Sequence, residues 1–417
     1  MSARAGQAER ARKKPDLPIV VYVLGLSLFA MGSSEFLISG VLPKVADDLR
    51  VSLPSAGVLI SAFAVGVLVG APPLAVLTLR WPRRATLLAS QALFVASIAL
   101  GMLARDYWLV LVSRVISGLA YAGFWAVAMT TAVSLVPPDR TARALSVVVS
   151  GLSLAMVVGG PAGTVISDLG GWRAGFWAVA VATAATAVAV RLTLRQSGPL
   201  DGPPPELRAE LRVMKQPRLW VAYTTTIATT AAYMVSFGYL GALLSETSGL
   251  PVAWIPAALS LFGIGAFVGL TIGGRLADRS PFRVLTAGIL GMISVSVALA
   301  LLADHLVAAI VLTFLLGVTG FLVNPAVIGR VYTIAASAPT LAGATNVSAF
   351  QLGIFLAPLL GGLAIGANFG LASVGWVGAA LAVVSLAAAL TDARLHRTPA
   401  QTDEPQAVEA KEQPIET

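Results

Sequence analysis

Residues 18–42 read PIVVYVLGLSLFAMGSSEFLISGVL, and the rest of the chain is interpreted around this stretch. Almost all of its residues are apolar, and roughly 20 such residues form a helix long enough to cross the hydrocarbon core of a bilayer. One carboxylate, Glu35, lies inside it. Acidic groups at membrane depth are costly, and they mark ion or substrate pathways. The stretch therefore predicts a membrane helix that carries a functional acid.

The composition excludes a water-soluble fold. The chain has 417 residues, of which 57% are hydrophobic and 12% are charged. Only lipid can cover so much apolar surface, so we expect a multi-pass membrane protein. Cysteine is absent, and the two histidines, His305 and His396, fall in a loop and a tail. No metal site, disulfide or cysteine nucleophile is therefore expected.

Apolar segments recur along the whole chain and predict an all-α membrane protein with twelve transmembrane helices. Most of the breaks between them are short and contain turn-forming residues such as Pro43, Pro82 and Pro251. The twelve predicted spans are 18–42, 54–78, 85–104, 107–135, 143–167, 172–194, 218–244, 252–274, 283–303, 306–330, 341–366 and 371–391.

The positions of the basic residues predict the topology. With the N-terminus placed inside, 23 of the 28 Lys and Arg fall on the inner side, four fall on the outer side, and Arg114 lies within a span. Cytoplasmic loops carry such an excess, so both termini are expected to be cytoplasmic. The same bias accounts for the net charge of +8 without a nucleic-acid partner.

The spans divide into two similar halves. The longest internal break, 195–217, is rich in proline and charge, and its 205–212 run is expected to form a short surface helix. At a fixed offset, Gly66, Gly118 and Arg80 recur as Gly265, Gly317 and Arg279. Two pseudo-symmetric six-helix bundles are typical of secondary transporters. The predicted organisation is a cytoplasmic tail 1–17, a bundle 18–194, a linker 195–217, a bundle 218–391 and a cytoplasmic tail 392–417.

Two charged residues are predicted to lie well inside the spans. Glu35 and Arg114 fall at matching depth, roughly 10–12 Å below the outer surface at 1.5 Å per helical residue. A nearby arginine and burial have opposite effects on the charge of a carboxyl group, so the pair could load and release a proton. The alternatives are structural: a neutral Glu35 held by hydrogen bonds, and an Arg114 paired with helix-end carbonyls.

Further polar and aromatic residues are candidates for lining a cavity or for packing between helices. Tyr121 and Trp125 share a helical face with Arg114. Tyr233, Asn346 and Gln351 supply polar groups in the second half, although such residues often only tie helices together.

A bend is expected in the fifth predicted span. Gly160 and Pro161 lie in the middle of that span. Proline removes a backbone hydrogen bond, and glycine permits close contact with a neighbouring helix.

Several motifs resemble a known family. Residues 274–279 read GRLADR, followed by Arg283, and match the loop signature of the major facilitator superfamily. Arg114 and Gly118 match the fourth-helix pattern of its drug:proton antiporters, and Gly160-Pro161 partly matches their fifth-helix motif. The closest resemblance is to actinobacterial chloramphenicol-resistance exporters, through the runs MGSSEF (31–36), GVLP (40–43), WPRR (81–84), SRV (113–115) and AGF (122–124).

The resemblance implies a twelve-span exporter of the plasma membrane that works by alternating access. It implies efflux of chloramphenicol or a related amphipathic antibiotic, with protons as the coupling ion and no other cofactor. Glu35 and Arg114 would couple protons, and the central cavity would be lined by residues of both halves, namely Tyr121, Trp125, Tyr233, Asn346 and Gln351. Gly274, Asp278 and Arg279 would form a cytoplasmic gate.

Other functions remain open at this point. Because a Ser-Glu-Phe first helix also occurs in sugar and purine-nucleoside exporters of the superfamily, such a substrate is the alternative. A membrane enzyme is disfavoured because clustered catalytic groups and a nucleotide-binding loop are absent from the sequence. A sensor is disfavoured because neither tail is long enough for an output domain. The expected partners are a small-molecule drug and the lipid bilayer, and the expected state is a monomer.

Overall fold

The computed structural model describes residues 17–78, 81–137, 140–194, 212–277, 280–336 and 339–397, and these residues are helical apart from short connections. In the first half the helices are α2 (Ile19–Leu49), α3 (Leu53–Leu77), α4 (Arg83–Leu103), α5 (Tyr107–Ser134), α6 (Thr141–Leu154), the π-helical turn η3 (Ala155–Gly159), α7 (Gly160–Gly170) and α8 (Trp172–Thr193).

The second half repeats this arrangement with more interruptions. Its helices are α10 (Pro217–Gly238), α11 (Leu240–Ala242), the π-helical turn η4 (Leu243–Thr247), the short 3-10 helix η5 (Val252–Trp254), α12 (Ile255–Ala277), α13 (Pro281–Leu301), α14 (Leu306–Leu322), α15 (Asn324–Ile334), α16 (Pro339–Gly366) and α17 (Ser373–Arg397).

Eleven helical stretches of the described chain are long and apolar enough to cross a membrane. A twelfth follows if α10 and the bent segment Leu240–Thr247, which meet at 41°, form one span. The expected all-α architecture of a multi-pass membrane protein is confirmed. The predicted helix at 205–212 lies almost entirely outside the described residues.

The prediction that Pro43 marks the end of the first span is wrong. Pro43 lies inside α2, which continues to Leu49. A proline removes one backbone hydrogen bond, and the following polar turn carries the helix beyond the apolar stretch. The helix ends where Arg50 adopts a left-handed conformation with φ 54° and its N–H bonds back to Asp47 O at 3.2 Å.

Three spans are interrupted: the seventh, where α10 meets Leu240–Thr247, the fifth and the tenth. The fifth is broken by the π-helical turn η3 directly before Gly160 and Pro161, where the sequence predicts a bend. The tenth is broken between Leu322 and Asn324, where Pro325 begins the new helix α15. Such breaks free backbone groups locally, and they often occur at functional positions in membrane helices.

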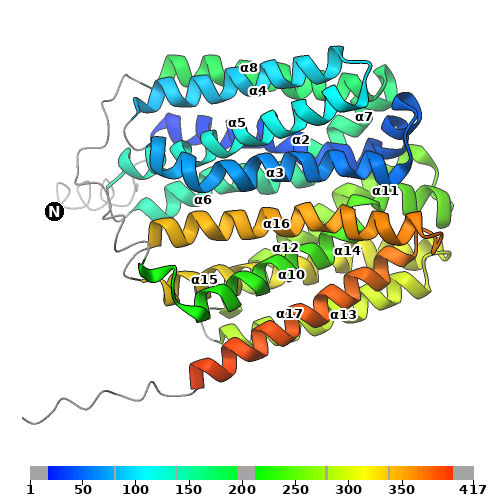
Figure 1. The fold of residues 1–417 in the computed structure, drawn as a ribbon. Coiled ribbons are helices and arrows are strands. Elements are labelled where there is room, and N and C mark those ends of the chain that lie inside the picture. The colour runs from blue at the N-terminus through cyan, green and yellow to red at the C-terminus, as the bar shows by residue number, and fades with distance from the viewer. Residues whose placement is uncertain are drawn as a thin grey trace, which may run out of the picture.

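The helices of each half pack mainly on one another, and the two halves meet along α3 and α16 (Figure 1). Side chains tie these two helices together at two depths. Ser61 donates a hydrogen bond to Phe355 O at 2.7 Å, and Ser348 donates one to Leu68 O at 3.1 Å. Helix α2 also contacts α11, and α7 contacts α12. The boundaries of the five segments stay a prediction.

Candidate functional site: a buried carboxyl group between the two halves

Glu35 lies on α2 at the contact between the two halves. Its side chain is buried, with 8% of the residue exposed. It borders a cavity of about 10 Å³, roughly the space of one water molecule. The other lining residues come from α2, α3, α10 and α16, namely Phe36, Ser39, Ile60, Met234, Phe237, Gly238, Ile354 and Pro358. Both halves therefore enclose the carboxyl group.

A polar contact links Glu35 to the second half. The carboxyl group lies within hydrogen-bonding reach of the Gln351 side chain on α16. Gln351 is itself 4% exposed. A carboxylate can accept a hydrogen bond from the amide NH₂, whereas a neutral carboxyl can also donate one to the amide oxygen. The protonation state of Glu35 thus changes an interaction across the contact between the halves.

Arg114 on α5 is buried beside this site, but its hydrogen bonds go to other groups. Its Nη1 donates to Ser34 Oγ at 2.7 Å, and its Nε donates to Leu59 O at 3.3 Å. The rings of Phe63 and Phe176 lie 4.7 and 5.6 Å from the guanidinium carbon. Among the described ion pairs there is none between Arg114 and Glu35, although their charges interact at longer range.

The two tyrosines predicted to line a cavity are fully buried. Tyr121 packs edge-on against Trp125 at a centroid distance of 5.6 Å, and its hydroxyl has no hydrogen-bond partner among the described residues. Tyr233 packs on Phe321 at 5.1 Å, with its hydroxyl near Asn324. Both hydroxyls lie close enough to interact with the charge of Glu35.

The remaining candidates of the second half differ in their relation to the site. Asn346 accepts a hydrogen bond from Thr226 on α10 at 2.9 Å, so it ties two helices together. Gly274 lies near the end of α12, with open space around its α-carbon. Asp278 and Arg279 fall outside the described residues. Gln351 is the residue of this group whose side chain lies within hydrogen-bonding reach of Glu35.

The Gly-Pro segment packs directly on the helix that carries Glu35. A β-carbon at Gly160 would lie 2.9 Å from the Phe36 side chain, and one at Gly163 would lie 2.8 Å from Leu37. Real β-carbons essentially never approach other atoms this closely. Glycine at position 160 therefore allows α7 to approach α2 closely, directly after the acid in α2.

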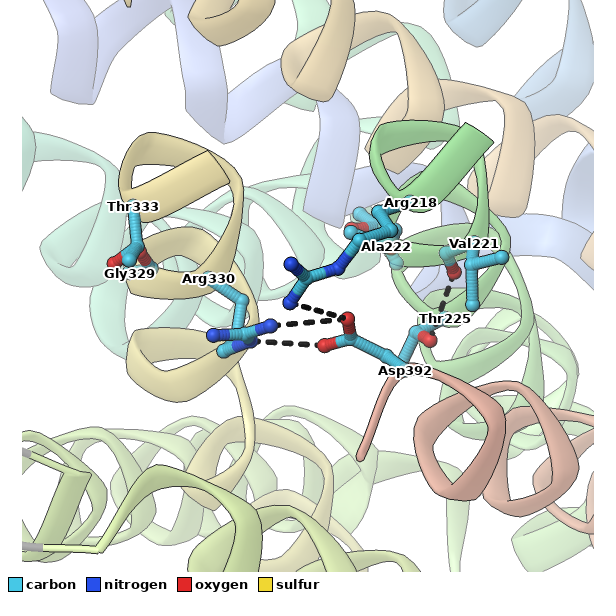
Figure 2. Close-up of polar contacts among 9 residues, drawn as sticks. Arg218, Val221, Ala222, Thr225, Gly329, Arg330, Thr333 and Asp392 are labelled. Atoms are coloured by element: carbon cyan, nitrogen blue, oxygen red, sulfur yellow. Dashed lines mark hydrogen bonds and ion pairs between the residues drawn. The ribbon is translucent and has the colours of Figure 1, made fainter. Parts of the chain in front are cut away.

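A second charged cluster shows that Glu35 and Arg114 are not alone inside the helices (Figure 2). Arg330 on α15 donates from Nε and Nη2 to the two carboxylate oxygens of Asp392 on α17, at 2.8 and 2.9 Å. Arg218 on α10 lies 3.9 Å from the same carboxylate. The side chains of Arg330 and Asp392 are 7% and 4% exposed.

The sequence interpretation placed Arg330 at the end of the tenth predicted span, and α15 does end soon after it, at Ile334. It placed Asp392 in the tail that follows the last predicted span. The apolar pattern stops at residue 391, but α17 continues to Arg397 with Asp392 facing inward. The alternation of Asp392 with apolar and basic residues in LTDARLHR was the available signal of a continuing amphipathic helix. In the part of the chain that the structure describes, no three acidic or histidine side chains are grouped to hold a metal ion.

Comparison with known proteins agrees with this architecture. The family model described as Major Facilitator Superfamily matches residues 24–358. A chloramphenicol resistance protein of Streptomyces lividans is 40% identical over 93% of this chain and 99% of its own length. The inner membrane transport protein YdhP of Escherichia coli K12 is 33% identical over 91% of this chain and 97% of its own length.

A solved structure has the same fold. The crystal structure of a bacterial homolog to the human lysosomal transporter Spinster, in an inward-facing and unoccupied conformation, superposes with a TM-score of 0.75. It is 16% identical in sequence, and the match covers 92% of this chain and 98% of that chain. The full-length relatives, the family match and the shared helical arrangement place this chain in the Major Facilitator Superfamily.

Proposed function

We propose that this transporter exports a small amphipathic antibiotic, chloramphenicol or a similar compound, in exchange for protons. Glu35 would carry the proton, and Arg114 would modulate its charge. Transport would proceed by alternating access of a central site between the two halves. The proposal places the protein in the plasma membrane with both termini in the cytoplasm, working as a monomer without a further cofactor.

The position of Glu35 is the observation that supports the proposed proton coupling. Its buried carboxyl group lies near the Gln351 side chain of the opposite half and beside a cavity with room for about one water molecule. Protonation removes a charge at this contact, and deprotonation restores it. Binding or loss of one proton can therefore bias how the halves pack, which is the property an antiporter requires.

The position of Arg114 supports the modulating role. Because its guanidinium is held by Ser34, the residue next to Glu35, movement of α2 relative to α5 would alter the distance between the two charges. Interaction between charges is strong in a medium of low dielectric constant, so a small displacement is sufficient to favour proton release.

The choice of substrate rests on the relatives. The 40% identical protein of Streptomyces lividans is described as conferring resistance to chloramphenicol. The side chains of Tyr121 and Tyr233 lie near Glu35, and Trp125 packs on Tyr121; these aromatic groups suit a compound that combines a ring with polar groups. The second candidate is export of a sugar or purine nucleoside, which is favoured by the Ser34-Glu35-Phe36 segment.

Proton release from detergent-purified protein tests the proposal. Addition of chloramphenicol to the weakly buffered wild type is expected to release protons, and Glu35→Gln is expected to abolish the release. Glu246→Gln, which removes an exposed acid from the turn η4, is the matched control and is expected to respond like the wild type. Release from the Glu35→Gln protein at the wild-type level would disprove coupling through Glu35.

The same assay separates the two substrate classes. Protons released by sugars or nucleosides but not by chloramphenicol would contradict antibiotic export and support the second candidate. Uptake into everted membrane vesicles, with and without an imposed pH gradient, then checks that the compound bound is also transported.

A further inference from the structure

The small cavity beside Glu35 is bordered by a second polar side chain, whose hydroxyl has no partner. Ser39 lies on the same helix, α2, and is 2% exposed. Its hydroxyl makes no hydrogen bond among the described residues. Ser33 of the same helix, by contrast, donates to Phe29 O at 2.7 Å. Buried hydroxyls are nearly always hydrogen-bonded, to protein or to ordered water, so an unpartnered one facing a cavity indicates water.

The spacing of Glu35 and Ser39 suits one bridging molecule. Residues four apart lie on the same face of a helix, about 6 Å from each other along its axis. The two side chains border the same cavity but do not bond to each other in the described structure. The cavity volume of about 10 Å³ is close to the space that one water molecule needs. One water between the two groups can therefore bond to both.

A backbone carbonyl of the second half completes the polar surroundings. Pro358 lies inside α16, and it cannot donate the helical hydrogen bond that the carbonyl of Ile354 would otherwise accept. Ser61 donates to the neighbouring carbonyl of Phe355 at 2.7 Å. The hydroxyl of Tyr239 donates to the carbonyl of Pro358 at 2.8 Å. Ile354 and Pro358 both border the cavity, so the carbonyl of Ile354 is left as an acceptor for a water there.

The other ionisable groups near Glu35 do not border this cavity. Arg114 and Tyr121 of α5 and Tyr233 of α10 interact with the charge of Glu35. None of the three lines the cavity, whose remaining walls are apolar side chains and glycine. Ser39 is thus the polar side chain that shares the cavity with the acid.

The cavity extends from Glu35 toward the predicted outer side. Ser39 follows Glu35 by one turn on α2, and Ile354 follows Gln351 by nearly one turn on α16. Both helices run toward the outer side in the predicted topology. Next to Ser39, the backbone of α11 packs directly on α2, because a β-carbon at Gly241 would lie 2.8 Å from Ser39 O. The bent segment after α10 therefore covers α2 beside Ser39.

We propose that one water molecule occupies this cavity and that Ser39 relays protons through it from the outer side to Glu35, an inference that rests on the proposed proton transport by Glu35. The water accepts a hydrogen bond from Ser39 and donates to the Glu35 carboxylate and to Ile354 O, and three such bonds are typical of a buried water. A proton that arrives at Ser39 Oγ transfers the hydroxyl hydrogen to the water, and the water passes one of its own hydrogens to the carboxylate. Serine and water are restored, and the carboxyl group becomes neutral.

Infrared difference spectroscopy of the detergent-purified, full-length protein tests the water directly. Spectra at acid minus alkaline pH, recorded in H₂O and in H₂¹⁸O, identify the bands of bound water because these bands shift on the exchange. The wild type is expected to show a water band that is lost in Glu35→Gln and shifted in Ser39→Ala. Ser33→Ala is the matched control and is expected to keep the wild-type band, since Ser33 bonds within its own helix.

A second pair of variants tests the backbone acceptor. Pro358→Ala supplies an N–H for Ile354 O, so it is expected to shift the same water band. Pro73→Ala is the control, because Pro73 lies inside α3 but does not border the cavity. Thermal unfolding in detergent identifies a variant that has lost its fold, in which case Ser39→Ala, which removes one buried oxygen, decides the question.

Transport in proteoliposomes tests the relay. Ser39→Ala is expected to slow chloramphenicol transport driven by a pH gradient about tenfold, the effect of losing one hydrogen bond on the transfer path. The same variant is expected to enlarge the solvent deuterium isotope effect, because proton transfer then limits the rate. Ser39→Thr retains a hydroxyl and is expected to restore both values. Binding of chloramphenicol is expected to stay at the wild-type level in both variants.

Three outcomes would overturn the proposal. A water band that is unchanged in Ser39→Ala would remove Ser39 from the site, and a wild-type rate and isotope effect in that variant would exclude the relay. Loss of the water band on addition of Na⁺ would assign the oxygen atoms to a cation. If Glu35→Gln abolishes proton release while Ser39→Ala behaves like the wild type, the relay fails and the proposed function stands. Wild-type release by Glu35→Gln would overturn both.

Discussion

Arg114 is held by hydrogen bonds to Ser34 on the first helix and to Leu59 O, and not by an ion pair with Glu35 among the described contacts. Spacing along a helix predicts which face a residue occupies, but not which of several nearby acceptors a long side chain reaches. Here Ser34 Oγ is the acceptor at 2.7 Å, and the two phenylalanine rings hold the guanidinium in place. A hydroxyl next to Glu35 thus takes part in positioning the nearest positive charge.

Replacement of Ser34 by alanine tests this role. Loss of a hydrogen bond to a buried charged group costs about 1.5–3 kcal/mol, so Ser34→Ala is expected to lower the unfolding temperature and to shift the pH dependence of proton release. Ser27→Ala is the control: Ser27 is equally buried on α2, but it bonds only to the carbonyl of Val23 in its own helix. Equal effects of the two substitutions on the pH dependence would contradict a link between Ser34 and the charge of Arg114.

At the scale of elements, the broken tenth span depends on an ion pair for its position. Helix α15 begins at Asn324-Pro325, after the single interrupting residue Val323 that follows α14. The bidentate Arg330–Asp392 pair fastens it to α17, and Arg218 connects both to α10 (Figure 2). The ion pair therefore connects the second part of the tenth span to both neighbouring helices.

Removing one charge of this pair is expected to destabilise the folded protein more than removing both. Asp392→Asn leaves Arg330 buried without its counter-charge, which costs about 3–5 kcal/mol, whereas the double variant Arg330→Met with Asp392→Leu is expected to recover much of this loss. Chemical unfolding in detergent measures the difference. A double variant that is as unstable as Asp392→Asn would show that the pair contributes more than charge compensation.

At the scale of the whole molecule, apolar segments were sufficient to predict the course of nearly every span. Lipid imposes the helix length and excludes unpaired backbone groups, so the pattern follows directly from composition. The burial of Glu35 between helices followed from the same rule, because an acid within an apolar segment must face protein or a water-filled cavity and not lipid.

Other features could not be predicted from the apolar segments, because they depend on contacts between distant parts of the chain. Arg330 and Asp392 are 62 residues apart, and neither has a local pattern that identifies the other. The π-helical turn before Gly160 follows from how closely α7 approaches α2, which is a property of packing. Pro43 was misread because a single proline does not end a helix whose next turn is outside the apolar layer.

The contact between the predicted outer ends of α3 and α16 allows a direct test of alternating access. A β-carbon at Gly362 would lie 3.2 Å from the β-carbon of Pro54, slightly below the roughly 3.5–4.5 Å found in disulfides, so a small shift of the two helix ends would accommodate a bridge. The natural chain has no cysteine, so the double variant Pro54→Cys with Gly362→Cys introduces a single possible bridge. Oxidation is expected to stop transport because it locks the outer ends together, and a reducing agent is expected to restore it. Each single variant is a control that should transport under both conditions. Undiminished transport by the bridged protein would mean that the halves need not separate at this end, which alternating access does not permit.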